Sequence, residues 1–161
     1  MGTHFELATG AQGRIVSLGL EGVAEKNITV RKLPVARGRG SRGELAEDEK
    51  PAIIISTMGT VGDRGGTNVR DDVDYPILIS ILASDNQDLE KNHDRYLTWA
   101  RRIRGRLHNQ RVVDSLAESM ADNFNCIVRA GPTTVPTAFW SGIWHSSLLL
   151  RCYVRETRGA V

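Results

Sequence analysis

The sequence predicts an α+β fold in which helices pack on one face of a mixed or antiparallel β-sheet with a long hairpin tip. Two apolar, strand-like segments, 52–58 and 75–83, precede an amphipathic segment with helical periodicity at 86–108. The polar connection between the two strands, 59–74, is long, because most hairpin loops have about two to five residues. With 161 residues, the chain is expected to form a single domain, 1–161, around one core.

The N-terminal segment, 5–25, has a helical pattern of apolar residues. Thr9 and Gln12 have the spacing of a capping box, a signature of a helix N-terminus. Interior glycines lower the helix propensity of this segment by roughly 1 kcal/mol each, unless they allow close packing on a sheet. The next segment, 28–33, alternates with β-branched residues and predicts a short strand, which Pro34 ends.

The segment 36–50 is almost free of apolar residues and is predicted to be a long loop. Its charges come in two blocks, first basic and then acidic: Arg37, Arg39 and Arg42, followed by Glu44, Glu47, Asp48 and Glu49. Blocks of mixed sign suit a protein that docks on several protein neighbours or faces a phosphate-lined channel. For any single charge, an ordinary solvated surface is the favoured interpretation.

The two apolar strands are expected to be the centre of the sheet. The near-continuous apolar run at 52–58 indicates burial on both faces. In the second strand, Ile77, Ile79 and Ile81 point to one face, and Leu78, Ser80 and Leu82 point to the other. One face is expected to carry the helices, and the other to meet a neighbouring subunit or a second sheet.

The helix predicted at 86–108 has a core-facing stripe, with Asp85 as its N-cap. The stripe is formed by Leu89, His93, Tyr96, Ala100, Ile103 and Leu107. Arg95, Arg102 and Arg106 fall on one flank of this helix, with Trp99 between the flank and the core. Tyr96 and Trp99 therefore point largely toward the core and are poor candidates for stacking on nucleic-acid bases.

The C-terminal third is predicted to continue with a short helix at 112–122, a strand at 124–130, a loop at 131–137 and a last strand at 147–156. An aromatic cluster, Phe139, Trp140 and Trp144, precedes the last strand. Cys126 and Cys152 lie in strand-like segments without C-x-x-C spacing and are read as buried free thiols in a reducing compartment.

The sequence has no recognisable catalytic, metal or cofactor motif, so the chain is expected not to be an enzyme and to need no cofactor. It has no Gly-x-Ser-x-Gly elbow, and its histidines lack metal-ligand spacing. The glycine-rich stretch 59–67 lacks the Gly-Lys-Ser/Thr end of a phosphate loop. Asp71, Asp72 and Asp74 could bind a hard cation, but a solvated loop base is the favoured interpretation. No apolar run approaches the ~18 residues of a membrane span, so no membrane partner is expected.

The order of elements from Pro51 onward resembles that of the tail-terminator proteins of long-tailed, lambda-like bacteriophages. A Pro-Ala-apolar strand leads into a long polar hairpin tip, a second apolar strand, a helix with a Trp and a short helix. A strand follows, and then a Trp-Ser segment, Trp140-Ser141, precedes the final strand. The similarity covers roughly two thirds of the chain, whereas the Arg-rich insertion 37–50 departs from the compact pattern of the family.

This resemblance implies a structural protein of the virion, in its tail or neck, that is assembled in the host cytoplasm. It implies a homo-hexameric ring that caps the tail tube, ends its polymerisation and provides the head-tail joining surface. The implied partners are the major tail tube protein and the head-tail connector or neck proteins, with DNA only as passing cargo. A head-tail completion, neck or minor tail protein is one alternative, and a nucleic-acid-binding module that uses the Arg clusters is another.

Two groups of residues are expected to make contacts in such an assembly. The polar tip supplies the first group, a candidate interface: Asp63, Arg64, Arg70, Asp71 and Asp72. The basic clusters supply the second group, candidate contacts with the ring lumen or with a partner: Arg37, Arg39, Arg42, Arg102 and Arg106. Both assignments rest on loop length and charge.

Overall fold

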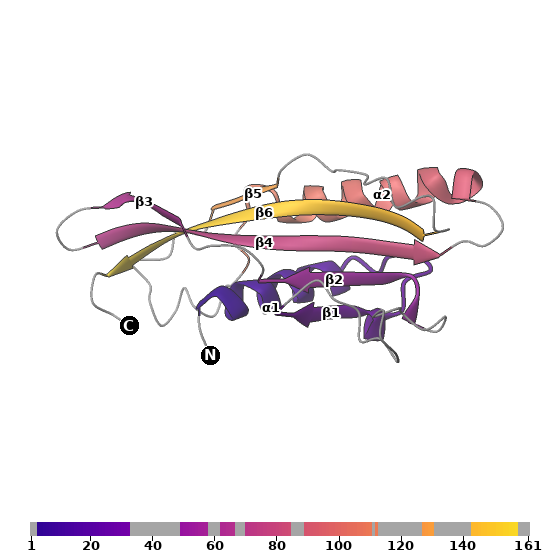
Figure 1. The fold of residues 1–161 in the computed structure, drawn as a ribbon, viewed down its shortest axis with the longest axis horizontal. Coiled ribbons are helices and arrows are strands. Elements are labelled where there is room, and N and C mark those ends of the chain that lie inside the picture. Colours follow the sequence, from indigo (N-terminus) through magenta and orange to yellow (C-terminus); the bar gives the residue numbers. More distant parts are fainter. Residues whose placement is uncertain are drawn as a thin grey trace.

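The computed structural model describes residues 3–32, 49–57, 62–66, 70–84, 89–110, 112, 127–130 and 143–157, and it confirms the α+β fold. The elements are α1 (Thr3–Val16), a 3-10 turn η1 (Glu25–Asn27), β1 (Ile28–Arg31), β2 (Ala52–Ser56), β3 (Gly62–Gly66), β4 (Arg70–Ser84), α2 (Leu89–Leu107), β5 (Ile127–Ala130) and β6 (Ile143–Thr157). Figure 1 shows the strands as one elongated sheet, with α1 and α2 running beside it.

The sheet is mixed and is organised around β4 and β6. Its strand order is β1-β2-β4-β6-β5, and β3 pairs with β4 beside this path. β1 and β2 are parallel, and the other pairs are antiparallel. β4 and β6 pair along their full length, from Arg70 opposite Thr157 to Ser84 opposite Ile143. This long ladder sets the long axis of the molecule (Figure 1).

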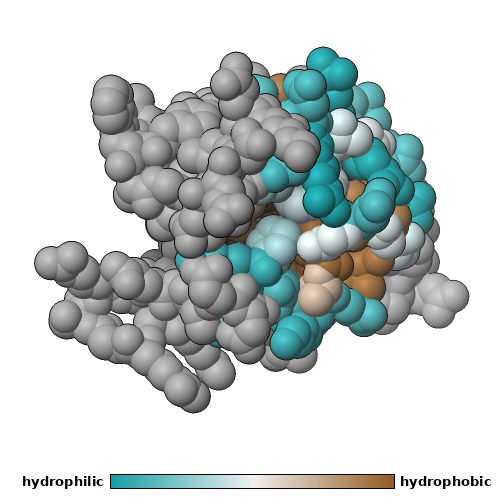
Figure 2. Space-filling model, turned by 90° about the vertical axis from the view of Figure 1, so that its right-hand side faces the viewer, coloured by the Kyte–Doolittle hydropathy of each residue, from teal (hydrophilic) through white to brown (hydrophobic). Residues whose placement is uncertain are grey.

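Both helices pack on the same face of the sheet and share one apolar core with it. The sheet contributes alternate residues, as period-two geometry requires: Ile53, Ile55, Ile77, Ile79, Ile81, Leu148, Leu150, Cys152 and Val154. The helices contribute Leu7, Ala8, Ala11 and Ile15 from α1, and Tyr96, Trp99, Ala100, Ile103 and Leu107 from α2. Figure 2, a view along the long axis, shows hydrophobic residues at this end of the molecule between hydrophilic borders.

The sequence predictions for the central strands and for α2 are confirmed. All five residues of β2 are buried, as its continuous apolar run indicates. Tyr96 and Trp99 are buried in the core, with ring centroids 5.1 Å apart. Cys152 is a buried free thiol. The predictions for 36–48, Asp85, 113–122 and Cys126, and those for the segment around Phe139 and Trp140, lie outside the described residues.

The prediction for the N-terminal helix is wrong at both ends. α1 begins at Thr3, so Thr9 lies inside the helix, and its hydroxyl donates a hydrogen bond to the Phe5 carbonyl 2.9 Å away. Gln12 does not cap the helix either, because its amide donates to the Ile28 carbonyl at 2.7 Å. α1 ends at Val16, where the chain turns through Gly19, which has a φ of +54°.

Two arginines of α2 hold the turn that follows α1. Arg102 donates to the Leu18 carbonyl at 2.8 Å, and Arg95 donates to the Glu21 carbonyl at 3.1 Å. The Arg95 guanidinium also lies over the Trp99 ring, 5.4 Å from its centroid, which adds a cation–π contact. Gly22 makes this arrangement possible, since it has a φ of +84° and a Cβ there would collide with the Arg95 side chain.

Replacing Gly22 by Ala should therefore destabilise the fold, by about 1–3 kcal/mol, because it combines a left-handed backbone with the displacement of Arg95. Gly13→Ala is a matched control. Gly13 lies in α1 with nothing within 4 Å of an added Cβ, so the same change should stabilise the helix by about 0.5–1 kcal/mol. Urea unfolding of the two variants measures both effects, and equal unfolding free energies would contradict the role given to Gly22.

Candidate functional site: an arm at one end of the sheet

The sheet continues beyond the helices at one end and forms a narrow projection, which we call the arm. It comprises β3, the first residues of β4 (70–73) and the last residues of β6 (155–157). In Figure 1 these strands extend to the left, past both helices. Four strand residues span about 13 Å, so the arm extends well beyond the core.

The predicted interface residues lie on the paired strands of the arm. Asp63 and Arg64 are in β3, and Arg70, Asp71 and Asp72 begin β4. The ladder places Asp63 opposite Val73, and Gly66 opposite Asp71, with a register shift between Asp63 and Gly66. The prediction of one long loop at 59–74 is therefore wrong in part, because β3 and the start of β4 form a hairpin.

The loop prediction failed for a physical reason. β3 has the sequence Gly-Asp-Arg-Gly-Gly, and glycine and aspartate are depleted in strands. No local pattern marks such a segment as a strand. Its conformation depends on the edge of β4, which is extended here because β6 pairs with it on the other side.

The root of the arm contains an ion pair. The Arg151 guanidinium of β6 lies 2.6 Å from Oδ2 of Asp74 in β4. The Asp74 side chain is 5% exposed, whereas that of Arg151 is 56% exposed. Oδ1 of Asp74 has no hydrogen-bond partner among the described residues. The interpretation of Asp74 as part of a solvated loop base is wrong, because the residue belongs to β4 and is buried.

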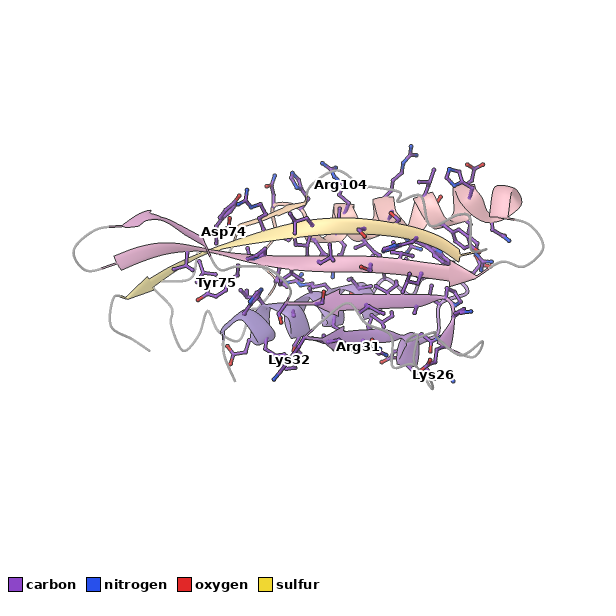
Figure 3. The ribbon with its side chains drawn as sticks, viewed as in Figure 1. Lys26, Arg31, Lys32, Asp74, Tyr75 and Arg104 are labelled. Carbon is purple, nitrogen blue, oxygen red and sulfur yellow. The ribbon has the colours of Figure 1, made fainter. Side chains whose placement is uncertain are left out.

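The N-terminus of α1 secures the root from the helical side of the sheet. Nε2 of His4 lies 2.6 Å from the Pro76 carbonyl oxygen, and its ring packs against Tyr75 with centroids 5.5 Å apart. Figure 3 shows Asp74 and Tyr75 side by side where the arm leaves the core. Successive strand residues point to opposite faces, so contacts with Asp74 and Tyr75 fix the root on both faces.

The sheet face opposite the helices is partly polar. On β6 it carries His145, Ser147, Leu149, Arg151 and Tyr153, and on β4 it carries Asp74, Pro76, Leu78, Ser80 and Leu82. Leu149 is 42% exposed, the one large hydrophobic residue that is exposed in the described part of the chain. We call this surface the open face; it is exposed at Leu149 and Arg151, whereas Asp74, Ser80 and Ile54 of β2 are buried on it. The sequence prediction that this face meets a neighbouring subunit or second sheet stays a prediction.

Ser147 and His145 form the described pair that most resembles a catalytic nucleophile and base. Oγ of Ser147 lies 3.1 Å from Nε2 of His145, and burial lowers the pKa of His145 below its usual value of 6.5. Both residues lie within a long strand, and Ser147 is half-buried, unlike a nucleophile presented on a sharp turn. We therefore read the pair as a hydrogen bond of the open face.

The predicted basic contacts have different surroundings. Arg37, Arg39 and Arg42 lie outside the described residues. Arg102 is bound to the Leu18 carbonyl, whereas Arg106 is exposed on α2. Within the described residues, no three His, Cys, Asp or Glu side chains gather as a metal site would require, and neither described helix has the length and apolar character to cross a membrane.

A second basic group borders β1, and of its members the sequence pattern indicates Arg31 and Lys32 but not Lys26. Lys26, Arg31 and Lys32 lie along the outer edge of the sheet, far from Arg104 on α2 (Figure 3). A pocket of about 370 Å³ opens there, lined by Lys26, Asn27, Thr29, Val30, Arg31, Glu49 and Ala52. The sequence signal was present in Arg31 and Lys32, but only the fold brings Lys26 and Glu49 to the same place.

The two partners of the ion pair should respond unequally to substitution. Arg151→Ala leaves a buried carboxylate without its cation and should cost about 1–3 kcal/mol of unfolding free energy. Asp74→Asn keeps the shape, removes the buried charge and leaves an arginine that water can solvate, so it should cost less than about 1 kcal/mol. Urea unfolding compares the two, and a larger cost for Asp74→Asn would contradict this account.

The protein should become less stable as the pH is lowered, because of His145. Because burial lowers the pKa of His145 in the folded state, the unfolded chain binds the proton more readily. The unfolding free energy is then unaffected above the usual value of 6.5 and decreases below it, by at most about 1.4 kcal/mol per pH unit. His145→Gln should flatten this decrease between pH 7.5 and 5.5 in urea titrations. An identical pH profile for both proteins would contradict it.

Comparison with known protein families finds no match, and no curated protein matches the chain in sequence. The function of the chain is therefore inferred from the arm, the ion pair at its root, the open face and the basic group beside β1.

Proposed function

We propose that this chain is a structural protein of a phage tail, which forms a ring on the end of the tail tube, stops its polymerisation and joins the tail to the head. The arm is the observation that carries this proposal. A β-hairpin that leaves the core on two long, continuous strands can reach a neighbouring molecule without loss of its own shape. The order of elements that resembles tail terminators adds support.

The arm has the properties of a contact element. The 15-residue ladder between β4 and β6 is continuous from the core into the arm, so unbroken backbone pairing joins the arm to the core. The buried Asp74 and the His4 contact hold its root. A preorganised arm loses less conformational entropy on binding than a flexible loop of the same length.

The proposal includes no catalytic step and treats DNA as cargo. Exposed cations on α2, Arg101, Arg104 and Arg106, could face DNA that passes through the ring. Arg95 and Arg102 are less suited to that role, because they donate to backbone carbonyls of the α1–β1 connection. The nucleic-acid-binding alternative would therefore depend on the exposed side of α2 or on the segment around Arg39.

Deleting 62–68 tests the proposed function. The deletion removes β3 and shortens the hairpin but leaves the core ladder, so the protein should fold. It should no longer cap tubes formed by the tail tube protein that the proposal gives it as a partner. Electron microscopy of tubes assembled with and without each variant measures tube length, and light scattering measures the mass of the ring.

Thr98→Ala, an exposed change on α2, is the control and should cap tubes like the unaltered protein. Tubes of unchanged length with the deletion variant would contradict the role of the arm. A chain that stays monomeric with the tube protein and never binds it would contradict the proposed function as a whole.

A further inference from the structure

The C-terminal half of α2 carries a concentration of positive charge. From residue 95 to residue 110 the chain has five arginines, all exposed, and no aspartate or glutamate. Arg95 and Arg102 donate to carbonyls of the α1–β1 connection. The other three make no hydrogen bond or ion pair with any described residue, and we call them the basic face: Arg101, Arg104 and Arg106.

The charge of the basic face is not balanced within the helix. Residues three and four positions apart are neighbours on a helix, and none of the three arginines has a carboxylate at such a position. Arg101 and Arg104 are instead neighbours of like charge, which destabilises a helix. The helix dipole favours Arg104 and Arg106 in the last turn, but it does not account for Arg101, which lies before that turn. A bound polyanion would relieve the repulsion.

The surface among these arginines is open to a ligand. Gly105 is adjacent to Arg104 and Arg106 in sequence and lies about one turn from Arg101. A Cβ added at Gly105 would meet nothing within 4 Å. Because glycine has no side chain, the backbone of a ligand can approach the helix closely there.

The chemistry of the basic face fits the phosphates of duplex DNA. The guanidinium group binds phosphate oxygens with two parallel hydrogen bonds. Tyr96 and Trp99 are buried, so the helix offers no aromatic ring on which the bases of a single strand could stack. The exposed residues between 94 and 110 are polar or glycine, whereas a protein interface has an apolar core. Protein–DNA interfaces are more polar and more positive.

We propose that the basic face binds the phosphate backbone of double-stranded DNA without sequence preference. This deepens the proposed function, because it identifies the side of the chain that turns toward the DNA in the ring, and it rests on that function only for this orientation. Asp94 lies on the exposed side of α2 about two turns before Arg101, so the contact is confined to the C-terminal half of the helix. Three phosphate contacts give weak, reversible binding, which suits DNA that must pass.

The salt dependence of binding tests the contact. Each neutralised phosphate contributes about −0.9 to the slope of log K against log salt concentration, so the three arginines contribute about −2.7. Their contribution alone lowers the affinity by about 40-fold between about 50 and 200 mM salt. Fluorescence anisotropy of a labelled duplex of about 20 base pairs, titrated with the full chain, measures the slope. Arg101→Gln/Arg104→Gln should make the slope less steep by about 1.8.

Lys26→Gln/Lys32→Gln is the matched control. It also removes two exposed cations, so each double variant lowers the net charge from +2 to 0. Figure 3 shows both lysines far from Arg104, so the control should keep the slope of the unaltered protein. Circular dichroism checks that both variants fold.

Three results would overturn the inference. The first is an equal loss of slope in both double variants, which would indicate attraction to net charge alone. The second is an unaltered protein that does not bind the duplex at low salt. The third is poly-glutamate that displaces the labelled duplex as well as unlabelled duplex of equal charge does, which would indicate an acidic protein partner. Tube capping is measured without DNA and therefore decides the proposed function separately.

Discussion

The structure depends on the antiparallel pairing of β4 with β6. This ladder supplies both strands at the centre of the sheet, so it positions the apolar rows on which α1 and α2 pack. It also runs past the helices and forms the base of the arm, where apolar burial is replaced by backbone pairing and one ion pair. The β4–β6 ladder thus supports the core and also sets the direction in which the arm extends.

The helices add a second constraint, through polar contacts rather than apolar ones. Arg95 and Arg102 extend from α2 to the carbonyls that follow α1, so the two helices are joined at the end of α1 as well as through the core. At the other end of α1, His4 contacts the root of the arm. α1 therefore connects the root of the arm with the turn that Arg95 and Arg102 hold, and a shift of this helix would displace both.

The sequence predicted those parts of the fold that have a local signal. β2 and the apolar part of β4 are rich in isoleucine, and α2 has a clear stripe, so their existence and their burial followed from pattern alone. β3 and the burial of Asp74 did not, because both depend on a strand that is distant in sequence. The sequence placed the charged residues of the arm in the tip between the two central strands, and their role as an interface stays a prediction. The position of Lys26 beside Arg31 and Lys32 follows only from the fold.

The distance in sequence between β4 and β6 has a consequence for how the protein is made. Residues 85–142 separate these strands, so the central ladder cannot form until β6 has been synthesised. Until then, the isoleucine rows of β2 and β4 lack their partner strand, and long-range pairing of this kind is slow to form. A chain truncated before β6 therefore lacks both the central strand pair of the core and the base of the arm. Such a chain should be unable to fold or to assemble.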